Sequence, residues 1–448
     1  MLQGDTIAAV ATAPGEGGVA VIRISGPDAA RVLQGCFRGR EDPLSSPRRM
    51  AYGRFVRGTE TVDLGLAVYM PGPSSFTGED TAELHCHGGQ AATRRVLEAA
   101  LEAGARMAQR GEFSRRAFLN GRMDLTQAEA VMDMVAARTD RAAAQALAQL
   151  RGRLGREITR MADQLLDLIA MIEVTCDYPE EDIAEEQTAV WVERLHQMQQ
   201  RLEQLLATAQ GGRVLREGVR CALAGRPNVG KSSLMNALMG EDRAIVTPVA
   251  GTTRDTVEAQ ADLDGLCVTL IDTAGIRETE DPVEALGVAR SRQALDEADL
   301  ALVVLDASEG LTEADRVILA QTEGMPRLVV ANKCDLAGGL PEGCGEAIAL
   351  SAKTGQGLAG LKQAVARLCG AGGVQPGEAV LTQTRHRDAV RRARMAVGEA
   401  LEALEAGYPL DMATGGLRAA WKALGEVTGG TVDEDVIDRI FEKFCLGK

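Results

Sequence analysis

The middle of the chain alternates short apolar runs with segments whose apolar residues recur at helical spacing. The runs predict strands at 219–224, 256–263, 266–271, 300–305, 328–331 and 347–350. The spacing predicts helices near 232–239, 284–297, 312–321 and 357–368. Such alternation is typical of a doubly wound, mostly parallel sheet that binds its ligand at the carboxyl ends of the strands. We therefore predict an inserted α/β domain over residues 216–376.

Apolar runs and helical spacing also occur together near the start of the chain. Apolar runs predict strands at 6–10, 19–24, 64–70 and 82–87, and helical spacing predicts helices at 28–33 and about 90–103. This mixture predicts an α+β domain over residues 1–120.

Two further stretches have a helical pattern alone. The first, residues 121–215, has apolar stripes at Leu147, Leu150 and Leu154 and at Leu165, Leu168, Ile169 and Ile172. The pattern breaks at 176–182 and resumes at 191–209; after the Gly-rich stretch 370–377 it returns at 382–406, 417–424 and 433–444. We infer one all-α domain built from residues 121–215 and 377–448, on either side of the inserted domain.

Composition and charge narrow the class of protein. A chain of 448 residues is long enough for about three domains. No apolar run reaches the 18 or so residues that span a bilayer, and the N-terminus has no basic cluster, so we expect a cytoplasmic protein with no membrane contact. The net charge of -15 argues against whole-surface attraction to nucleic acid. Candidate local patches are Arg110, Arg115, Arg116 and Arg122, and Arg387, Arg391 and Arg392; a solvated helix face is the alternative for each.

The nine cysteines are scattered, odd in number and without a CxxC pair, so we expect reduced thiols. His85-Cys86-His87 is the one cluster that resembles a set of metal ligands. Because no second ligand pair accompanies it, packing or substrate contact is favoured over a zinc site.

The stretch from Gly225 to Ser232 fits a phosphate-binding loop, a glycine and four variable residues followed by Gly-Lys-Ser. It lies between a predicted strand and a predicted helix, as the chemistry requires, although a Gly-rich turn is the alternative. Backbone amides and the helix N-terminus would face the phosphates, Lys231 would reach the terminal phosphates, and Ser232 would hold Mg²⁺.

Four further elements follow in order. Gly251 to Asp255 offers a hydroxyl for Mg²⁺, and Asp272 to Gly275 follows a strand and offers a carboxylate for its water shell. Asn332 to Asp335 ends with a carboxylate that can accept the N1 and N2 protons of guanine, and Ser351 to Lys353 can supply an amide to guanine O6. All five elements in order predict GTP as the ligand.

The residue that would orient the attacking water is not the usual Gln. Ile276 occupies that position. Asn228 is a candidate ligand for a monovalent cation, and Glu284 is a candidate for orienting water; a helix-start acid is the alternative for Glu284.

Over essentially its whole length the chain resembles the tRNA modification GTPase family called MnmE or TrmE. The motifs that carry the resemblance are Asp5-Thr6-Ile7, Arg23-Ile24-Ser25-Gly26, Phe76 to Asp80, His87-Gly88-Gly89, Gly111 to Ser114, Arg116 to Asn120 and the terminal Phe444 to Lys448. The resemblance implies an N-terminal folate-binding-like domain that forms a homodimer, and a helical domain that carries a Ras-like G domain. It also implies an FAD-dependent MnmG-type partner in a heterotetramer. The implied reaction places an aminomethyl-type group (carboxymethylaminomethyl) on C5 of the wobble uridine of certain tRNAs, using a tetrahydrofolate derivative.

The resemblance also implies site residues. For the folate derivative they are Arg23, Glu83, Arg122 and Lys448. For GTP they are Asn228, Val229, Gly230, Lys231, Ser232, Ser233, Thr247, Pro248, Val249, Ala250, Gly251, Thr252, Thr253, Asp272, Thr273, Ala274, Gly275, Asn332, Lys333, Asp335, Ser351, Ala352 and Lys353. The metal positions, for Mg²⁺ and K⁺, are Ser232, Thr253, Asn228, Thr247, Val249 and Thr252. The chain departs from the family at Arg122, where Lys is frequent, and at Leu446, where Ile is usual.

The C-terminal Cys445-Leu446-Gly447-Lys448 is a further candidate. Gly447 and the terminal Lys fit a prenylation signal poorly, and a flexible end is the stronger alternative. An apolar stripe of Val436, Ile437, Ile440 and Phe444 would dock the preceding helix and bring the tail toward the folate-like site, in the same protomer or across the dimer. We hypothesise that Cys445 serves the modification reaction or its assembly.

Two other functions share part of this pattern. A regulatory or ribosome-assembly GTPase would have every G-domain motif but no use for the folate-like site and the tail. A stand-alone folate-dependent methyltransferase would leave the G domain unexplained.

Overall fold

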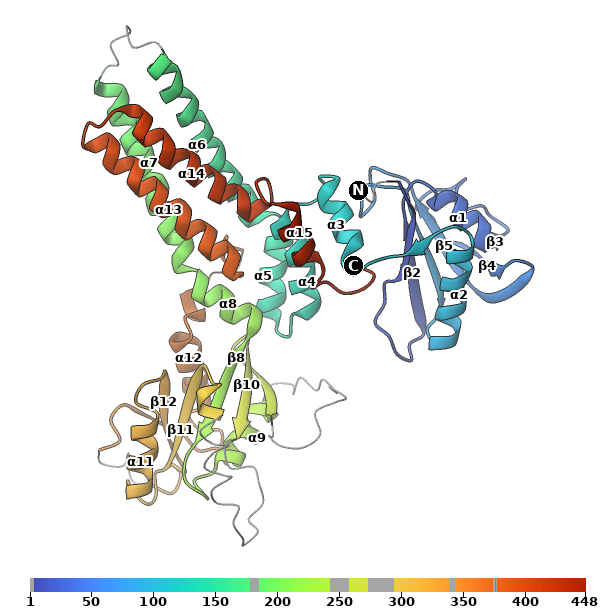
Figure 1. Cartoon of the computed structure of the whole chain (residues 1–448). Coiled ribbons are helices and arrows are strands. Elements are labelled where there is room, and N and C mark those ends of the chain that lie inside the picture. The colour runs from blue at the N-terminus through green and yellow to red at the C-terminus, as the bar shows by residue number, and fades with distance from the viewer. Residues whose placement is uncertain are drawn as a thin grey trace. The chain divides into compact units, whose positions relative to one another are not determined.

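The structure is a computed structural model that describes residues 4–177, 185–241, 258–272, 294–337, 340, 343–373, 375 and 377–448. The chain divides into two compact units (Figure 1). The first unit contains the residues up to Met132 together with Gly425–Lys448, and the second contains Asp133–Leu424. No helix among the described residues is long and apolar enough to cross a membrane.

The first unit is built on a seven-stranded sheet with the order β3-β4-β5-β6-β2-β1-β7. Its strands are β1 (Ile7–Val10), β2 (Val19–Ser25), β3 (Phe37–Gly39), β4 (Ala51–Arg57), β5 (Glu60–Met70), β6 (Thr81–His87) and β7 (Arg106–Met107). All pairs are antiparallel except β1 with β7. The predicted strands are confirmed; β3, β4 and β7 are additional, and β5 begins before the predicted 64.

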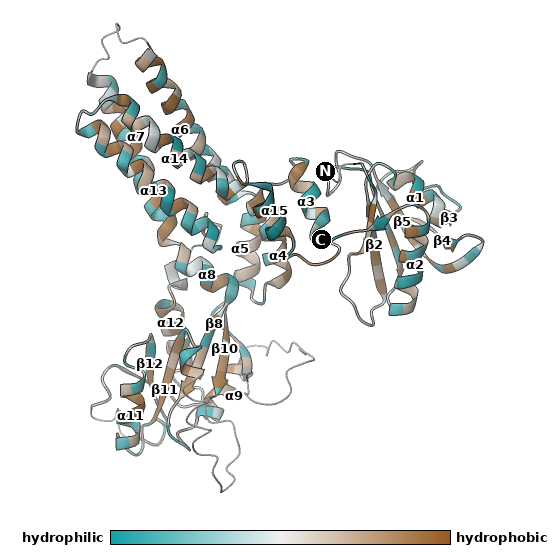
Figure 2. Cartoon of the chain, viewed as in Figure 1, coloured by the Kyte–Doolittle hydropathy of each residue, from teal (hydrophilic) through white to brown (hydrophobic). Residues whose placement is uncertain are grey.

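Alternation along the strands gives this sheet one apolar face. Ile22 and Ile24 of β2 and Leu84 of β6 are fully buried and pack against α1 (Ala29–Cys36) and α2 (Gln90–Glu102). The residues between them point to the opposite face. Figure 2 shows the hydrophobic colouring that runs along these strands.

The remaining helices of the first unit are α3 (Glu112–Leu119), α15 (Glu434–Phe441) and most of α4 (Leu125–Ala136), whose last turn belongs to the second unit. The predicted helix 433–444 is shorter than expected, and Val436 does not belong to its apolar stripe because it is 47% exposed. The buried residues are Ile437, Phe441 and Phe444, which pack with Leu125 of α4. Their spacing of four and three residues places them on one helical face and its continuation.

The second unit contains the helices α5 (Asp140–Leu150), α6 (Arg153–Asp177), α7 (Glu185–Ala207), α8 (Ala209–Glu217), α13 (Thr384–Glu405) and α14 (Leu410–Thr428). The predicted stripe from Leu165 to Ile172 is confirmed, since all four of its residues are buried. The stripe at Leu147 is wrong in part: Leu147 is 39% exposed, and Leu154 is the buried member. Helix α14 begins at Leu410, before the predicted 417.

The same unit contains a six-stranded sheet with the order β13-β12-β11-β8-β10-β9. Its strands are β8 (Val219–Ala224), β9 (Glu258–Leu263), β10 (Leu266–Asp272), β11 (Leu300–Asp306), β12 (Arg327–Asn332) and β13 (Ala347–Ala349), with helices α9 (Lys231–Glu241), α11 (Glu313–Gln321) and α12 (Leu358–Leu368). Only β9 is antiparallel to its neighbour, so the predicted mostly parallel sheet is confirmed. Most of the predicted helix 284–297 lies outside the described residues.

The chain leaves β8 toward β10 on one side and continues on the other side with β11. This reversal makes the carboxyl ends of β8 and β11 the switch point at which sheets of this kind bind ligands.

Candidate functional sites

The phosphate-binding loop follows β8, and α9 begins at its Lys231. Gly225 and Gly230 have φ of 156° and 93°. A Cβ atom on Gly225 would lie 2.5 Å from the carbonyl oxygen of Val304, and one on Gly230 would lie 2.3 Å from Nδ2 of Asn332. Glycine is therefore required at both positions by backbone conformation and by space.

Lys231 and Ser232 open α9. Lys231 Nζ donates to the carbonyl oxygens of Gly225 (2.7 Å) and Arg226 (2.9 Å), and burial lowers its pKa, although Asp272 opposes this shift. Ser232 Oγ donates to Asp272 Oδ2 at the end of β10 (3.2 Å). The loop and the β10 terminus thus place an ammonium, a hydroxyl and a carboxylate together at the helix N-terminus.

Asn332, buried at the end of β12, joins three of the predicted motifs. Its Nδ2 donates to the carbonyl oxygen of Val229 (2.9 Å), and its Oδ1 accepts from the Ala352 amide (3.0 Å). The phosphate-binding loop, the Asn332–Asp335 motif and the Ser351–Lys353 motif therefore meet at one side chain.

Lys333 adds a second link. Its Nζ donates to the carbonyl oxygen of Asn228 (2.9 Å) and forms an ion pair with Asp306, which ends β11. Burial tends to raise the pKa of Asp306, but the bond from Lys333 outweighs it and the pKa is lowered. Asn228 and Lys333 both have φ of 64°, a left-handed conformation that is uncommon for residues other than glycine. Such strain clusters at ligand sites.

The outer residues of the predicted site are exposed. Ser233, Asp335 and Lys353 face solvent, whereas Ser351 is buried. Among the described residues the side chain of Asn228, also exposed, has no hydrogen bond. The predicted residues that lie outside the described parts of the chain are Thr247, Pro248, Val249, Ala250, Gly251, Thr252, Thr253, Thr273, Ala274, Gly275 and Glu284.

A second candidate site lies in the first unit, on the sheet face opposite α1 and α2. Arg23 of β2 lies directly across from Glu83 of β6, and the two form a 3.0 Å ion pair. The Arg23 guanidinium carbon is 5.1 Å from the ring centroid of Phe76 and 5.9 Å from that of Phe113. One cation is therefore held by a carboxylate and two aromatic rings.

Arg122 and the C-terminal tail belong to the same unit. Arg122 is exposed, and its Nε donates to the carbonyl oxygen of Ser75, next to Phe76 (3.2 Å). Gly447 has φ of 89°, and a Cβ atom there would lie 2.1 Å from the carbonyl oxygen of Val10 in β1. The Cys445 carbonyl oxygen accepts from the amide of Gly111 (3.4 Å), and Cys445 is exposed. The tail thus lies against the end of β1, and β1 is the neighbour of the strand that carries Arg23. Lys448, the last residue of the tail, is half-buried.

The sequence motifs missed several residues of both sites. Asp306 is a lone carboxylate after a fully buried strand, a signal that could have identified it. Phe76 and Phe113 lie within the motifs that carried the family resemblance, but nothing local shows that their rings meet Arg23.

His85, Cys86 and His87 do not form one set of metal ligands. Cys86 is buried against the helices, and burial raises its pKa to about 11. His85 pairs with Glu83 (3.3 Å) and His87 with Asp63 (2.8 Å). The three side chains have different partners, which favours packing over a shared metal site.

The two candidate basic patches are neutralised in part. Arg116 is buried among Asp5, Glu79 and Glu112, and Arg115 pairs with Asp438 (2.7 Å), so neither is part of a free cationic surface. In the second patch Arg387 pairs with Asp388 (3.2 Å). Arg110, Arg122 and Arg391 remain exposed.

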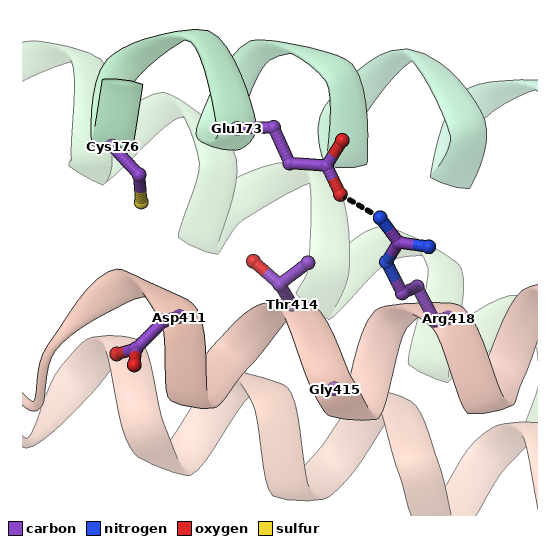
Figure 3. Close-up of a pocket in the computed structure, with 6 residues that line it drawn as sticks. All are labelled: Glu173, Cys176, Asp411, Thr414, Gly415 and Arg418. Atoms are coloured by element: carbon purple, nitrogen blue, oxygen red, sulfur yellow. Dashed lines mark hydrogen bonds and ion pairs between the residues drawn. The ribbon is translucent and has the colours of Figure 1, made fainter. Parts of the chain in front are cut away.

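A separate pocket of about 430 Å³ lies between α6 and α14 (Figure 3). Its charged residues include Glu173 and Arg418, which form an ion pair across it. The lining residues are Glu173, Cys176, Asp411, Thr414, Gly415 and Arg418, none of which is a predicted site residue.

Comparison with known proteins accounts for both parts of the chain. The family model for the N-terminus of the GTP-binding protein TrmE matches residues 6–122, and the model for the MnmE helical domain matches residues 125–445. The tRNA modification GTPase MnmE of Symbiobacterium thermophilum is 49% identical, with 99% of each chain covered. The proteins of the same name from Roseiflexus sp. and Heliobacterium modesticaldum are 47% and 46% identical, over 100% and 99% of this chain and 100% of theirs. With this identity over its full length, the chain belongs to the MnmE family of tRNA modification GTPases.

Proposed function

We propose that the chain is a K⁺-dependent GTP hydrolase that works with an FAD-dependent partner on tRNA. The reaction would install an aminomethyl-type group on C5 of the wobble uridine, using the one-carbon unit of a tetrahydrofolate derivative. The chain would act as a homodimer within a larger complex with the partner, in the cytoplasm.

The nucleotide site supports the first part. Lys231 would bind the terminal phosphates, and Asp335 would accept the guanine N1 and N2 protons. Ser232 would hold Mg²⁺ and Asp272 would hold its water shell; the two side chains lie within hydrogen-bond distance of each other (3.2 Å). A bound Mg²⁺ would neutralise charge on the phosphate oxygens.

Cation binding and orientation of the attacking water would depend on other residues. Asn228, exposed and held in a left-handed conformation, would contribute an oxygen to K⁺ together with Thr247, Val249 and Thr252. Glu284 would orient the attacking water, because Ile276 replaces the usual Gln. The charge of K⁺ would stabilise the phosphate charge that develops in the transition state.

The single observation that carries the second part is the Arg23–Glu83 site with the Cys445–Lys448 tail on the neighbouring strand. A GTPase that is only a switch has no use for it. Its polar groups fit a tetrahydrofolate derivative: Glu83 can accept from ring N–H groups, while Arg122 and Lys448 can donate to the carboxylates of the glutamate tail. Cys445 would serve the modification step or its assembly.

The test is the modification state of tRNA in cells that lack the protein. Mass spectrometry of digested tRNA should show unmodified wobble uridine in the deletion strain, restored by the wild-type gene and not by Arg23→Ala. A full level of modified uridine in the deletion strain would overturn the proposal.

A further inference from the structure

The Arg23 site depends on the loop between β5 and β6, because Phe76 of this loop contacts the Arg23 guanidinium. Phe113, the other ring, is fully buried against Ile7 and Ala9 of the sheet and is fixed by that packing. Phe76 also packs against this cluster, but it is half-buried and belongs to a loop rather than to a strand or helix. Its position therefore depends on that contact and on whatever holds the loop.

Buried polar groups hold this loop to β2. Ser25 Oγ, at the end of β2, is 2.7 Å from Thr77 Oγ1 and donates to Glu79 Oε2 (2.7 Å). Ser25 and Thr77 are both fully buried. Glu79 thus lies three residues after Phe76, with one carboxylate oxygen bonded to the strand that carries Arg23.

Arg116 of α3 completes the attachment. Its Nη1 lies 3.2 Å from both oxygens of Glu79 and 2.9 Å from the Asp5 carbonyl oxygen. Its Nη2 donates to Asp5 (2.7 Å) and Glu112 (2.9 Å). A guanidinium can bond these three residues at once because its donors form a planar fork, which an ammonium group lacks.

We propose that Arg116 and Glu79 are positioning residues of the Arg23 site, holding Phe76 against the guanidinium so that the site is preformed for its ligand. The inference rests on the proposed binding of a tetrahydrofolate derivative and assigns roles to two residues that need not touch it. Preorganised sites bind more tightly because the ligand does not have to order them.

The test measures tetrahydrofolate binding to the full chain by anaerobic calorimetry. Arg116→Lys keeps the charge but cannot reach all three carboxylates, and Glu79→Gln leaves the bonds of Arg116 to Asp5 and Glu112 in place. We expect each variant to bind about tenfold more weakly, a loss of about 1.4 kcal/mol, because the ligand must then order the loop. Because Glu79→Gln retains the ion pairs among Asp5, β7 and α3, it separates loosening of the loop from failure to fold.

Arg57→Lys is the matched control. Arg57 also joins two carboxylates, Glu98 and Glu102, in the same unit, but these belong to α2 on the other face of the sheet. Its affinity for tetrahydrofolate should equal that of the wild type.

A double-mutant cycle identifies the route of the effect. If Arg116 acts through the Arg23 site, Arg116→Lys should lose little further affinity in an Arg23→Ala background. Losses that add in full would overturn the inference, as would unchanged affinity in Arg116→Lys while the wild type binds. A wild-type chain that does not bind tetrahydrofolate would instead refute the proposed function, and this inference with it.

Discussion

At the scale of single residues, the side-chain amide of Asn332 joins two loops of the nucleotide site, and both of its polar atoms form hydrogen bonds. Asn332 donates to Val229 and accepts from Ala352 inside the protein, so it holds the phosphate-binding loop and the Ser351–Lys353 loop at a fixed separation. A side-chain amide offers an N–H donor and a carbonyl acceptor on two separate atoms. The side chain also fills the space next to Gly230 that a Cβ atom would need.

Replacing Asn332 with Asp should therefore weaken nucleotide binding. The carboxylate can still accept from Ala352, but it leaves the buried Val229 carbonyl oxygen without its donor. An unsatisfied buried group costs about 1–3 kcal/mol, which corresponds to a loss of roughly 5- to 150-fold in affinity if it appears in binding. Fluorescence titration with labelled GTP measures this loss. Asn236→Asp on the exposed side of α9 is the control; equal affinities for the two variants would contradict the assigned role.

The exposed Asp335 should determine which base is bound. A carboxylate accepts the N1 and N2 protons of guanine, whereas an amide pairs with the carbonyl that xanthine has in place of the amino group. Asp335→Asn should thus reduce GTP hydrolysis and increase that of xanthosine triphosphate, measured by phosphate release for both nucleotides. An unchanged preference for GTP would show that another residue recognises the base.

At the scale of elements, ion pairs join α3 to β7 and to the segment that precedes β1. Arg106 of β7 and Arg116 of α3 both pair with Asp5 and Glu112. Burial alone would raise the pKa values of the two carboxyls, but the bonds from the arginines outweigh it and both pKa values are lowered. The arrangement resists acid until these groups are protonated.

The lowered pKa of Glu112 sets the sign of a pH dependence. Its contribution to stability is complete above the ordinary value of 4.5 and is lost as the pH falls through the lower value in the folded chain. Amide hydrogen exchange in α3, corrected for intrinsic rates, should therefore accelerate as the pH falls below 4.5, and Glu112→Gln should be less protected at neutral pH with a weaker dependence on acid. Glu98→Gln is the control, because Glu98 is half-buried and belongs to α2. A wild-type α3 equally protected above and below this range would contradict the assignment.

The sequence predicts those parts of the fold and of the sites whose pattern lies in residues that are consecutive or close along the chain. The five nucleotide motifs are runs of consecutive residues, and Asp272 and Asn332 end strands as predicted. The Arg23–Glu83 pair depends on the register of β2 with β6, and it came only from family resemblance. Sequence alone indicates a surface cation at Arg116, because its partners Asp5 and Glu79 are distant in sequence. Val436 lies outside the apolar stripe because Ile437 and Phe441 define the buried face of α15, and Val436 is turned about 100° from Ile437 around the helix.

At the scale of the whole molecule, the two proposed chemistries belong to different units of the chain. GTP would bind within Asp133–Leu424, and the folate derivative within the unit formed by the N-terminal residues and Gly425–Lys448. The end of the chain belongs to the same compact unit as its beginning because Gly447 packs on β1 and Phe444 on α4. A substitution in the tail should therefore change tRNA modification separately from GTP hydrolysis.

Cys445→Ser is the substitution that tests this separation. The thiol is exposed and the Cys445 backbone, not its side chain, bonds Gly111, so serine should leave the tail in place. If the thiol takes part in the modification, the variant should lose most modified wobble uridine in cells while its purified form hydrolyses GTP at the wild-type rate. Cys176→Ser is the matched control, since Cys176 is also exposed but belongs to α6 in the other unit; it should retain both activities. Full modification by Cys445→Ser would reduce the tail to a structural end, and a parallel loss of GTP hydrolysis would show that the two units do not act separately.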